Sequence, residues 1–281
     1  MSGSTTHPTS AAVHAPADLG LPDLDTPRSQ VLLAIADDAL VTGHRAAHWT
    51  GVAPTLEEDL AFATIAQDGV NHADLWYQVL VGEDHPQRQA AVDALGLGRA
   101  PSGYRHAVLC EHEPRDFAFT LARHWVTTEL EAVRLDALAT SPDGAVAALA
   151  AKLRHELRYH LEHAALWVDR LVADEDAHDR FRTSLEVVLP EVAGFLEPVA
   201  DEEAPDAQRV LAGGHRGLRA ALHDRLATRL GSSGDGELVG LLEAVAPAGL
   251  GGRAGRHGPA FTEDVWPELT ALYRADPSAR W

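Results

Sequence analysis

Four long segments with helical hydrophobic periodicity restrict the possible folds of this chain more than any other feature. They cover about residues 28–49, 55–80, 116–139 and 145–171. Within each segment, apolar side chains recur three and four residues apart, as in helices that bury one face. Thr55 and Glu58 form a capping box at the start of the second segment. We therefore predict an all-α fold.

The four segments have the length of the helices in a ferritin-like four-helix bundle, roughly 22 to 27 residues each. Further helical pieces are predicted over residues 177–195, 207–230, 237–245 and 263–275, with Gly-rich breaks over residues 231–236 and 249–258. Residues 1–26 are rich in Ser, Thr, Pro and Ala, and we expect a mobile N-terminal tail there. We predict one ferritin-like domain over residues 27–281, a four-helix core with additional C-terminal helices.

Composition excludes several classes of partner. A formal net charge of −19 repels nucleic acid, anionic lipid and the phosphates of coenzyme A, and it suits docking on a basic protein. No stretch reaches the roughly 18 uncharged apolar residues that a membrane helix requires. Cys110 is the one cysteine, so no intrachain disulfide can form. We predict a cytoplasmic protein in which Cys110 is a small core residue rather than a nucleophile.

Carboxylates and imidazoles occur on or beside the apolar faces of all four long helices. They are Asp38 in the first, Asp68 and His72 in the second, Glu129 and Asp136 in the third, and Glu156 and His160 in the fourth. A buried carboxylate is costly unless it is paired, protonated or bound to a metal. We expect Glu129 and Asp136 to find partners on the fourth helix, in His160 or Arg158. Glu156 and His160 are four residues apart and are expected to meet.

Di-iron carboxylate bundles take a Glu from each of two helices and a Glu-x-x-His motif from each of two others. The second and fourth segments lack this motif, because Asn71 stands three residues after Asp68 and Tyr159 stands three after Glu156. Each histidine comes one residue late, which turns its imidazole by about 100°. Three interpretations stay open: a buried polar network without metal, an unusual metal site, or exposure of most of these groups to solvent.

Several motifs together resemble one known family. They are Ala-Ile-Ala-Asp-Asp-Ala-Leu-Val-Thr-Gly-His-Arg over residues 34–45, the stretches over residues 53–59, 116–123, 156–163 and 167–171, and the ending over residues 251–257 with Trp281. In this order they are similar to the C subunit of the phenylacetyl-CoA 1,2-epoxidase complex. The resemblance covers about residues 28–281 and implies a ferritin-like fold.

The resemblance also implies a function. In that complex the C subunit is regarded as structural, and it pairs tightly with a homologous catalytic subunit that carries the di-iron centre. A small accessory subunit and a reductase complete a hetero-oligomer that forms a ring epoxide on phenylacetyl-CoA. On this basis we expect the chain to have no catalytic residue, no metal and no cofactor of its own, and to stabilise its catalytic partner.

Two other functions are compatible with the residues. The chain could be an autonomous di-metal oxidase or oxygenase on another substrate, using Glu129, Asp136, Glu156 and His160. Alternatively, Arg253, Arg256 and His257 in the Gly-rich C-terminal segment could approach a phosphate of a ligand. The simpler interpretation of these three residues is a loop whose arginines pair with acidic groups of this chain or of a partner.

Overall fold

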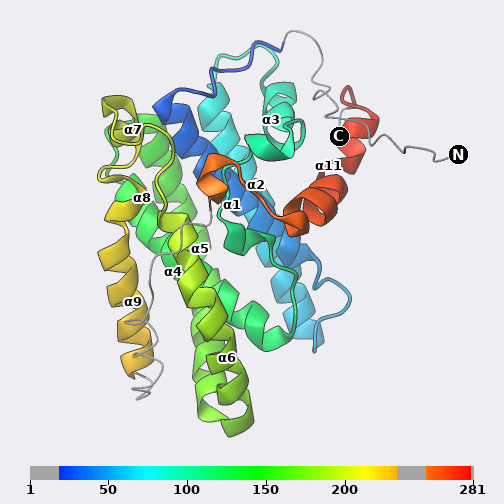
Figure 1. Cartoon of the computed structure of the whole chain (residues 1–281), viewed down its shortest axis with the longest axis vertical. Helices are drawn as coiled ribbons and strands as arrows, with labels where there is room; N and C mark the ends of the chain where they lie inside the picture. Colours follow the sequence, from blue (N-terminus) through cyan, green and yellow to red (C-terminus); the bar gives the residue numbers. More distant parts are fainter. Residues whose placement is uncertain (1–18, 233–250, 280–281) are drawn as a thin grey trace, which may run out of the picture.

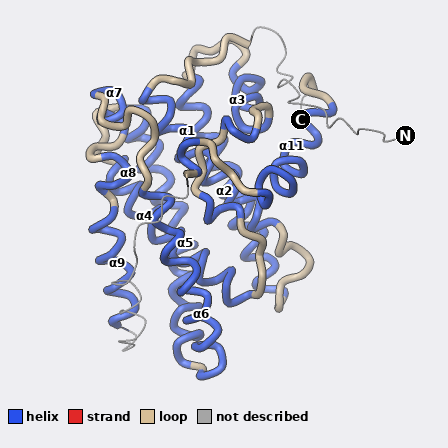
Figure 2. Tube along the Cα trace, in the orientation of Figure 1, coloured by secondary structure: helices blue, strands red, loops and turns tan. Residues whose placement is uncertain are grey.

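A computed structural model describes residues 19–232 and 251–279. These residues form helices, turns and loops, and no strand occurs among them (Figures 1 and 2). The predicted all-α, ferritin-like bundle is confirmed. None of the described helices is both long enough and apolar enough to cross a bilayer.

The four bundle helices are α1 (Pro27–Ala47), α2 (Leu56–Val81), α4 (Phe117–Leu138) and α5 (Gly144–Ala173). Each begins at a residue whose side chain accepts a backbone N–H of the first turn: Thr26, Thr55, Asp116 and Asp143. These caps are local signals, so the predicted boundaries lie within a few residues of the observed ones.

Helix α1 lies deep in the molecule, with Val31, Ala34 and Ile35 fully shielded from solvent. It packs along α2, where the backbones meet at Gly43 and Gly69. A Cβ atom added at Gly69 would lie 2.8 Å from the Cα of Gly43 and 3.2 Å from the carbonyl oxygen of Ala39. Only a pair of glycines allows the two helices to approach this closely.

Shorter elements cover the bundle. They are α3 (Arg88–Leu97), α6 (Glu175–Val192), α7 (Pro205–Val210), α8 (Gly214–Gly217), α9 (Arg219–Ser232) and α11 (Trp266–Ala275). The predicted helical region over residues 207–230 is not one continuous helix. Gly213 and Gly214, with φ values of 77° and 60°, separate α7 from α8, and α8 ends before Leu218, ahead of α9. The predicted helix over residues 237–245 lies outside the described residues.

The first and the last described segments of the chain both pack on the bundle. Leu19 is buried with Ala94 and Tyr273, so the segment that precedes α1 packs against α3 and α11. The predicted mobile tail over residues 1–26 stays a prediction for residues 1–18, which are outside the described part. At the other end, residues 251–257 run over the bundle and insert Arg253 beside α1 (Figure 1). Cys110 is buried as predicted, and its burial raises the pKa of the thiol.

Candidate functional site in the bundle interior

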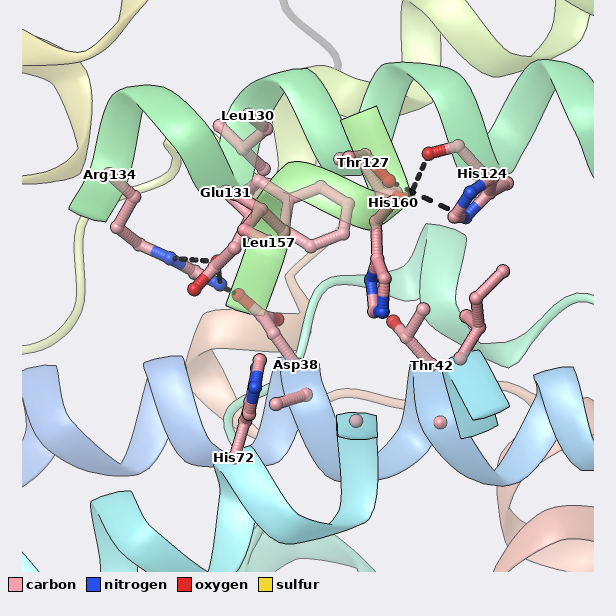
Figure 3. Close-up of a pocket in the computed structure, with 16 residues that line it drawn as sticks. Asp38, Thr42, His72, His124, Thr127, Leu130, Glu131, Arg134, Leu157 and His160 are labelled. Carbon is pink, nitrogen blue, oxygen red and sulfur yellow. Dashed lines mark hydrogen bonds and ion pairs between the residues drawn. The ribbon is translucent and has the colours of Figure 1, made fainter. Parts of the chain in front are cut away.

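A small cavity lies between α1, α2, α4 and α5 (Figure 3). Its volume is about 90 Å³. Two sets of polar side chains line it: Asp38, Glu131 and Arg134 in one, and His72, His124 and His160 in the other. We refer to these two sets as the arginine end and the histidine end. A space of this size accepts a few water molecules, at about 30 Å³ each.

At the arginine end, two guanidinium groups neutralise one buried carboxylate. Arg134 from α4 donates to Asp38 at 2.7 Å, and Arg253 donates to both Asp38 oxygens at 2.9 and 2.8 Å. Glu131 accepts from Arg134 on the other side of that guanidinium. Two carboxylates therefore face two guanidiniums, and the cluster has no net charge.

Backbone carbonyls are further acceptors for Arg253, whose Nε atom has no partner among the described residues. Its guanidinium donates to the carbonyl oxygens of Arg105 at 2.7 Å, Phe195 at 3.1 Å and Ala34 at 3.3 Å. Burial by itself would raise the pKa of Asp38, but the charges of Arg253 and Arg134 hold that pKa below its ordinary value. Asp38 is therefore a permanent anion that is fully satisfied by the protein itself.

At the histidine end, α2 and α5 are joined by three imidazole–carboxylate pairs. His72 faces Glu156 at 3.0 Å, His160 faces Asp68 at 3.0 Å, and His163 faces Glu58 at 2.9 Å. The expected contact between Glu156 and His160 along α5 is replaced by these contacts between helices. The sequence pattern placed both residues on the right face but could not show that α2 offers closer partners.

His124 from α4 is the least satisfied group of the histidine end. Its Nε2 atom is buried without a hydrogen-bond partner, and its Nδ1 atom lies 3.4 Å from the Thr128 hydroxyl. Burial, together with His160 and His163, lowers the pKa of His124 well below its ordinary value. Burial also lowers the pKa of His160. Both imidazoles are neutral at pH 7.

The donor set does not fit a carboxylate-bridged pair of iron ions. His72 and His160 both line the cavity, so both imidazoles face the interior, as their place on or beside the apolar faces predicts. The residues three positions earlier, where Glu-x-x-His places its glutamates, are Gly69 and Leu157. Both line the cavity and offer no ligand atom. Compared with the Glu-x-x-His motif, the chain therefore lacks the two glutamates but keeps a histidine on each helix.

Position 69 cannot regain a carboxylate in this packing, because any Cβ there would collide with the backbone of Gly43. Among the described residues, two other groups bring three potential ligand atoms within 4.8 Å of one another: His44, His48 and Glu268, and His106, Glu111 and His257. Neither group lies in this cavity.

Two of the predicted interior acids have other positions and partners. Glu129 is buried as expected, but its partner is Arg225 of α9, at 2.7 Å, rather than His160 or Arg158. Asp136 is half exposed and pairs with the equally exposed Arg154 at 2.8 Å. The expectation that both acids join the interior network is wrong, because α4 has a second covered side that faces α9.

The C-terminal trio is also split. Arg253 is 2% exposed and bound to Asp38, and the His257 side chain is buried against Glu111 at 2.7 Å. Only Arg256 is exposed. A phosphate therefore has no access to the trio as a set, and the interpretation of arginines paired with acidic groups of this chain holds for Arg253.

Sequence reasoning missed several residues that line the cavity, notably Thr42, His124, Glu131 and Arg134. One available signal was the spacing counted backwards from His72 and His160, which marks Gly69 and Leu157 as the altered positions. The contact of Arg253 with Asp38 joins residues 215 positions apart and has no local signal.

The comparisons with known proteins agree with the motifs. A family model described as phenylacetic acid catabolic protein matches residues 15–281. Over 258 residues the chain is 28% identical to the C subunit of the 1,2-phenylacetyl-CoA epoxidase of Escherichia coli (strain K12), an alignment that covers 89% of this chain and 97% of that relative. The resemblance drawn from the motifs is confirmed.

Proposed function

Since the chain belongs to the family of phenylacetic acid catabolic proteins, we propose that it is the structural, non-catalytic subunit of a multicomponent di-iron oxygenase that epoxidises phenylacetyl-CoA. In this proposal the chain stabilises a homologous catalytic subunit, which holds the iron. A small accessory subunit and a reductase complete the cytoplasmic complex.

The observation that carries this proposal is the content of the bundle interior. The carboxylate of α1 is neutralised by Arg134 and Arg253, so its charge is not available to a metal ion. The glutamate positions of both Glu-x-x-His motifs are occupied by Gly69 and Leu157. These features favour a scaffold over an autonomous di-metal oxidase.

Cavity size supports the same conclusion. Small-molecule sites commonly have volumes of about 300–1,000 Å³. The interior cavity has about 90 Å³. It is therefore too small for an aromatic acyl group, which supports a substrate site on the partner.

A surface on α2 and α5 suits the homologous partner. These neighbouring helices expose large apolar side chains: Leu56, Leu60 and Val70 on α2, and Tyr159 and Leu166 on α5. Exposed apolar side chains gathered on adjacent elements mark interaction surfaces. Covering them with a second helical subunit would remove apolar area from water without using the acidic surface.

The test is co-expression with the catalytic subunit of the same organism. We expect the two chains to co-purify, the iron to remain with the partner after separation, and phenylacetyl-CoA turnover to require both chains. Leu60→Lys combined with Leu166→Lys should reduce recovery of the partner at least tenfold, whereas Val52→Lys, at an exposed turn residue, should not. Two equivalents of iron held by this chain alone would overturn the proposal.

A further inference from the structure

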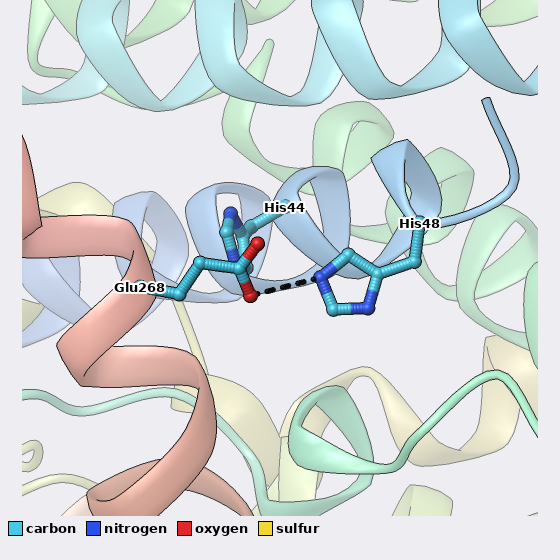
Figure 4. A group of neighbouring side chains, drawn as sticks. All are labelled: His44, His48 and Glu268. Carbon is cyan, nitrogen blue, oxygen red and sulfur yellow. Dashed lines mark ion pairs between the residues drawn. The ribbon is translucent and has the colours of Figure 1, made fainter. Parts of the chain in front are cut away.

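A second group of potential metal ligands lies outside the bundle interior, between α1 and α11 (Figure 4). His44 and His48 are four residues apart near the end of α1, so both imidazoles project from one face. Glu268 from α11 faces them. Its Oε2 atom lies 3.4 Å from His44 Nε2 and 3.3 Å from His48 Nε2.

These distances match the edge of a small coordination tetrahedron. Zinc binds histidine nitrogen at about 2.0–2.1 Å and carboxylate oxygen at about 2.0–2.2 Å, so two ligands of a tetrahedral ion lie about 3.3 Å apart. The two measured separations between nitrogen and oxygen have this value. All three ligand atoms are within 4.8 Å of one another.

The two imidazoles converge on one carboxylate. Among the described residues, the polar contact of each buried Nε2 atom is its ion pair with Glu268, at 3.4 Å for His44 and 3.3 Å for His48. The Nδ1 atom of His48 lies 3.5 Å from Arg45 Nη1, which is too long to fix the tautomer of the ring. Arg45 is instead held by the Glu111 carbonyl oxygen at 2.7 Å and by Asp264 at 2.8 Å. Apart from Glu268, no described group therefore competes with a metal ion for either Nε2 atom.

The Glu268 side chain is 57% exposed, so an ion held here keeps a position open to water or to a further ligand.

The other group of three ligands provides a contrast. In the His106, Glu111 and His257 group, the two rings stack 4.1 Å apart at an interplanar angle of 15°. Glu111 accepts from His257 at 2.7 Å and from the backbone of Gly258 at 3.2 Å, and the second nitrogen of His257 is bonded to the Tyr104 carbonyl oxygen. In that group Glu111 and His257 are occupied by hydrogen bonds, and the Nδ1 atom of His106 is the ring nitrogen without a partner among the described residues.

We propose that His44, His48 and Glu268 bind one divalent transition-metal ion of the zinc class and that this ion fastens α11 to α1. Imidazole and carboxylate ligands suit such ions. With three protein ligands and one open position, the site resembles neither a closed structural zinc site nor the carboxylate-rich centre of a di-iron protein. It is independent of the function proposed above.

The test uses the full chain, stripped of metal with a chelator and titrated with Zn²⁺ by calorimetry. We expect one equivalent to bind, with at least a tenfold loss of affinity in Glu268→Gln and a larger loss in the double variant His44→Gln/His48→Gln. His223→Gln, which changes a half-exposed histidine of α9, should bind as the parent chain does.

Two further readouts separate a metal site from a set of ion pairs. Co²⁺ in place of zinc should give the intense visible absorption of a four-coordinate ion, and Zn²⁺ should slow hydrogen exchange in α11 of the parent chain but not of the double variant. Unchanged zinc affinity in a folded double variant would overturn the proposal. Measuring iron in the same double variant isolates the bundle interior, so this result and the test of the scaffold function can fail separately.

Discussion

The two ends of the interior cavity stabilise the carboxylates of the bundle in different ways. At the arginine end, the carboxylate of Asp38 is balanced by guanidiniums that stay charged at any physiological pH, and backbone carbonyl oxygens accept further hydrogen bonds from Arg253. At the histidine end, imidazoles face carboxylates, and His124 retains an unpaired nitrogen. The chain thus places fixed cations of its own at one end and retains titratable groups at the other.

This difference indicates which end holds the fold together. Removing the counter-charge of a buried carboxylate lowers the free energy of unfolding by several kcal/mol. A partly exposed imidazole–carboxylate pair contributes less, because water screens it. We therefore expect stability to depend mainly on the arginine end and the pH response to come from the histidine end.

The largest effect is expected from Arg253→Met. Loss of this guanidinium leaves Asp38 with one cation and leaves three buried carbonyl oxygens without their donor. We expect the free energy of unfolding to fall by about 3–5 kcal/mol. Urea denaturation followed by circular dichroism measures this change. Arg256→Met, at an exposed position in the same segment, should stay within about 0.5 kcal/mol of the parent. Equal effects of the two variants would refute the assignment.

The contact between α1 and α2 ranks second. In Gly69→Ala, the new methyl group would lie 2.8 Å from the Cα of Gly43, and backbone atoms can move aside only if the helices separate. We expect a loss of about 1–3 kcal/mol. Gly144→Ala is the matched control, since no atom lies within 4 Å of a Cβ at the first position of α5. That variant should be neutral or gain up to about 1 kcal/mol. If Gly69→Ala also proves neutral, the helices are not in close contact.

The pH response should sharpen the comparison. The pKa values of His124 and His160 are lowered in the folded chain, so between those values and about 6.5 the unfolded chain binds more protons. Stability is therefore present above pH 6.5 and is lost as the pH falls, by up to about 1.4 kcal/mol per pH unit for each histidine. The arginine end contributes nothing here, because the pKa of Asp38 is lowered.

Thermal unfolding of the parent and of His124→Leu at pH 7.0 and 5.5 tests this response. Leucine fills a similar volume, and the Nε2 atom that it removes has no partner. The variant should lose less stability on acidification than the parent does. The buried His106 and His215, whose pKa values are also lowered by burial, retain part of the response in both chains. A steeper loss in the variant would contradict the assignment.

Local signals predicted most of the fold, and long-range contacts decided the site. Side-chain caps and apolar spacing depend only on residues that are close in the sequence, so the four bundle helices were predictable. The side of α4 that α9 covers was not, so Glu129 was given the wrong partner. The family motifs also marked residues 251–257 but gave no reason for them, whereas the structure shows that Arg253 reaches Asp38 across the chain.

The smallest effect is expected from the pair between His72 and Glu156. If Glu156 were a buried acid, its removal would lower the free energy of unfolding by a few kcal/mol. In the structure its side chain is 34% exposed and is also near Lys152. We expect Glu156→Gln to cost about 0.2–1 kcal/mol, and less in high salt, because water and ions screen a pair of this kind. Asp136→Asn, which breaks a still more exposed pair with Arg154, sets the lower bound in the same denaturation experiment. A loss near that of Arg253→Met would mean that the histidine end supports the bundle as strongly as the arginine end does.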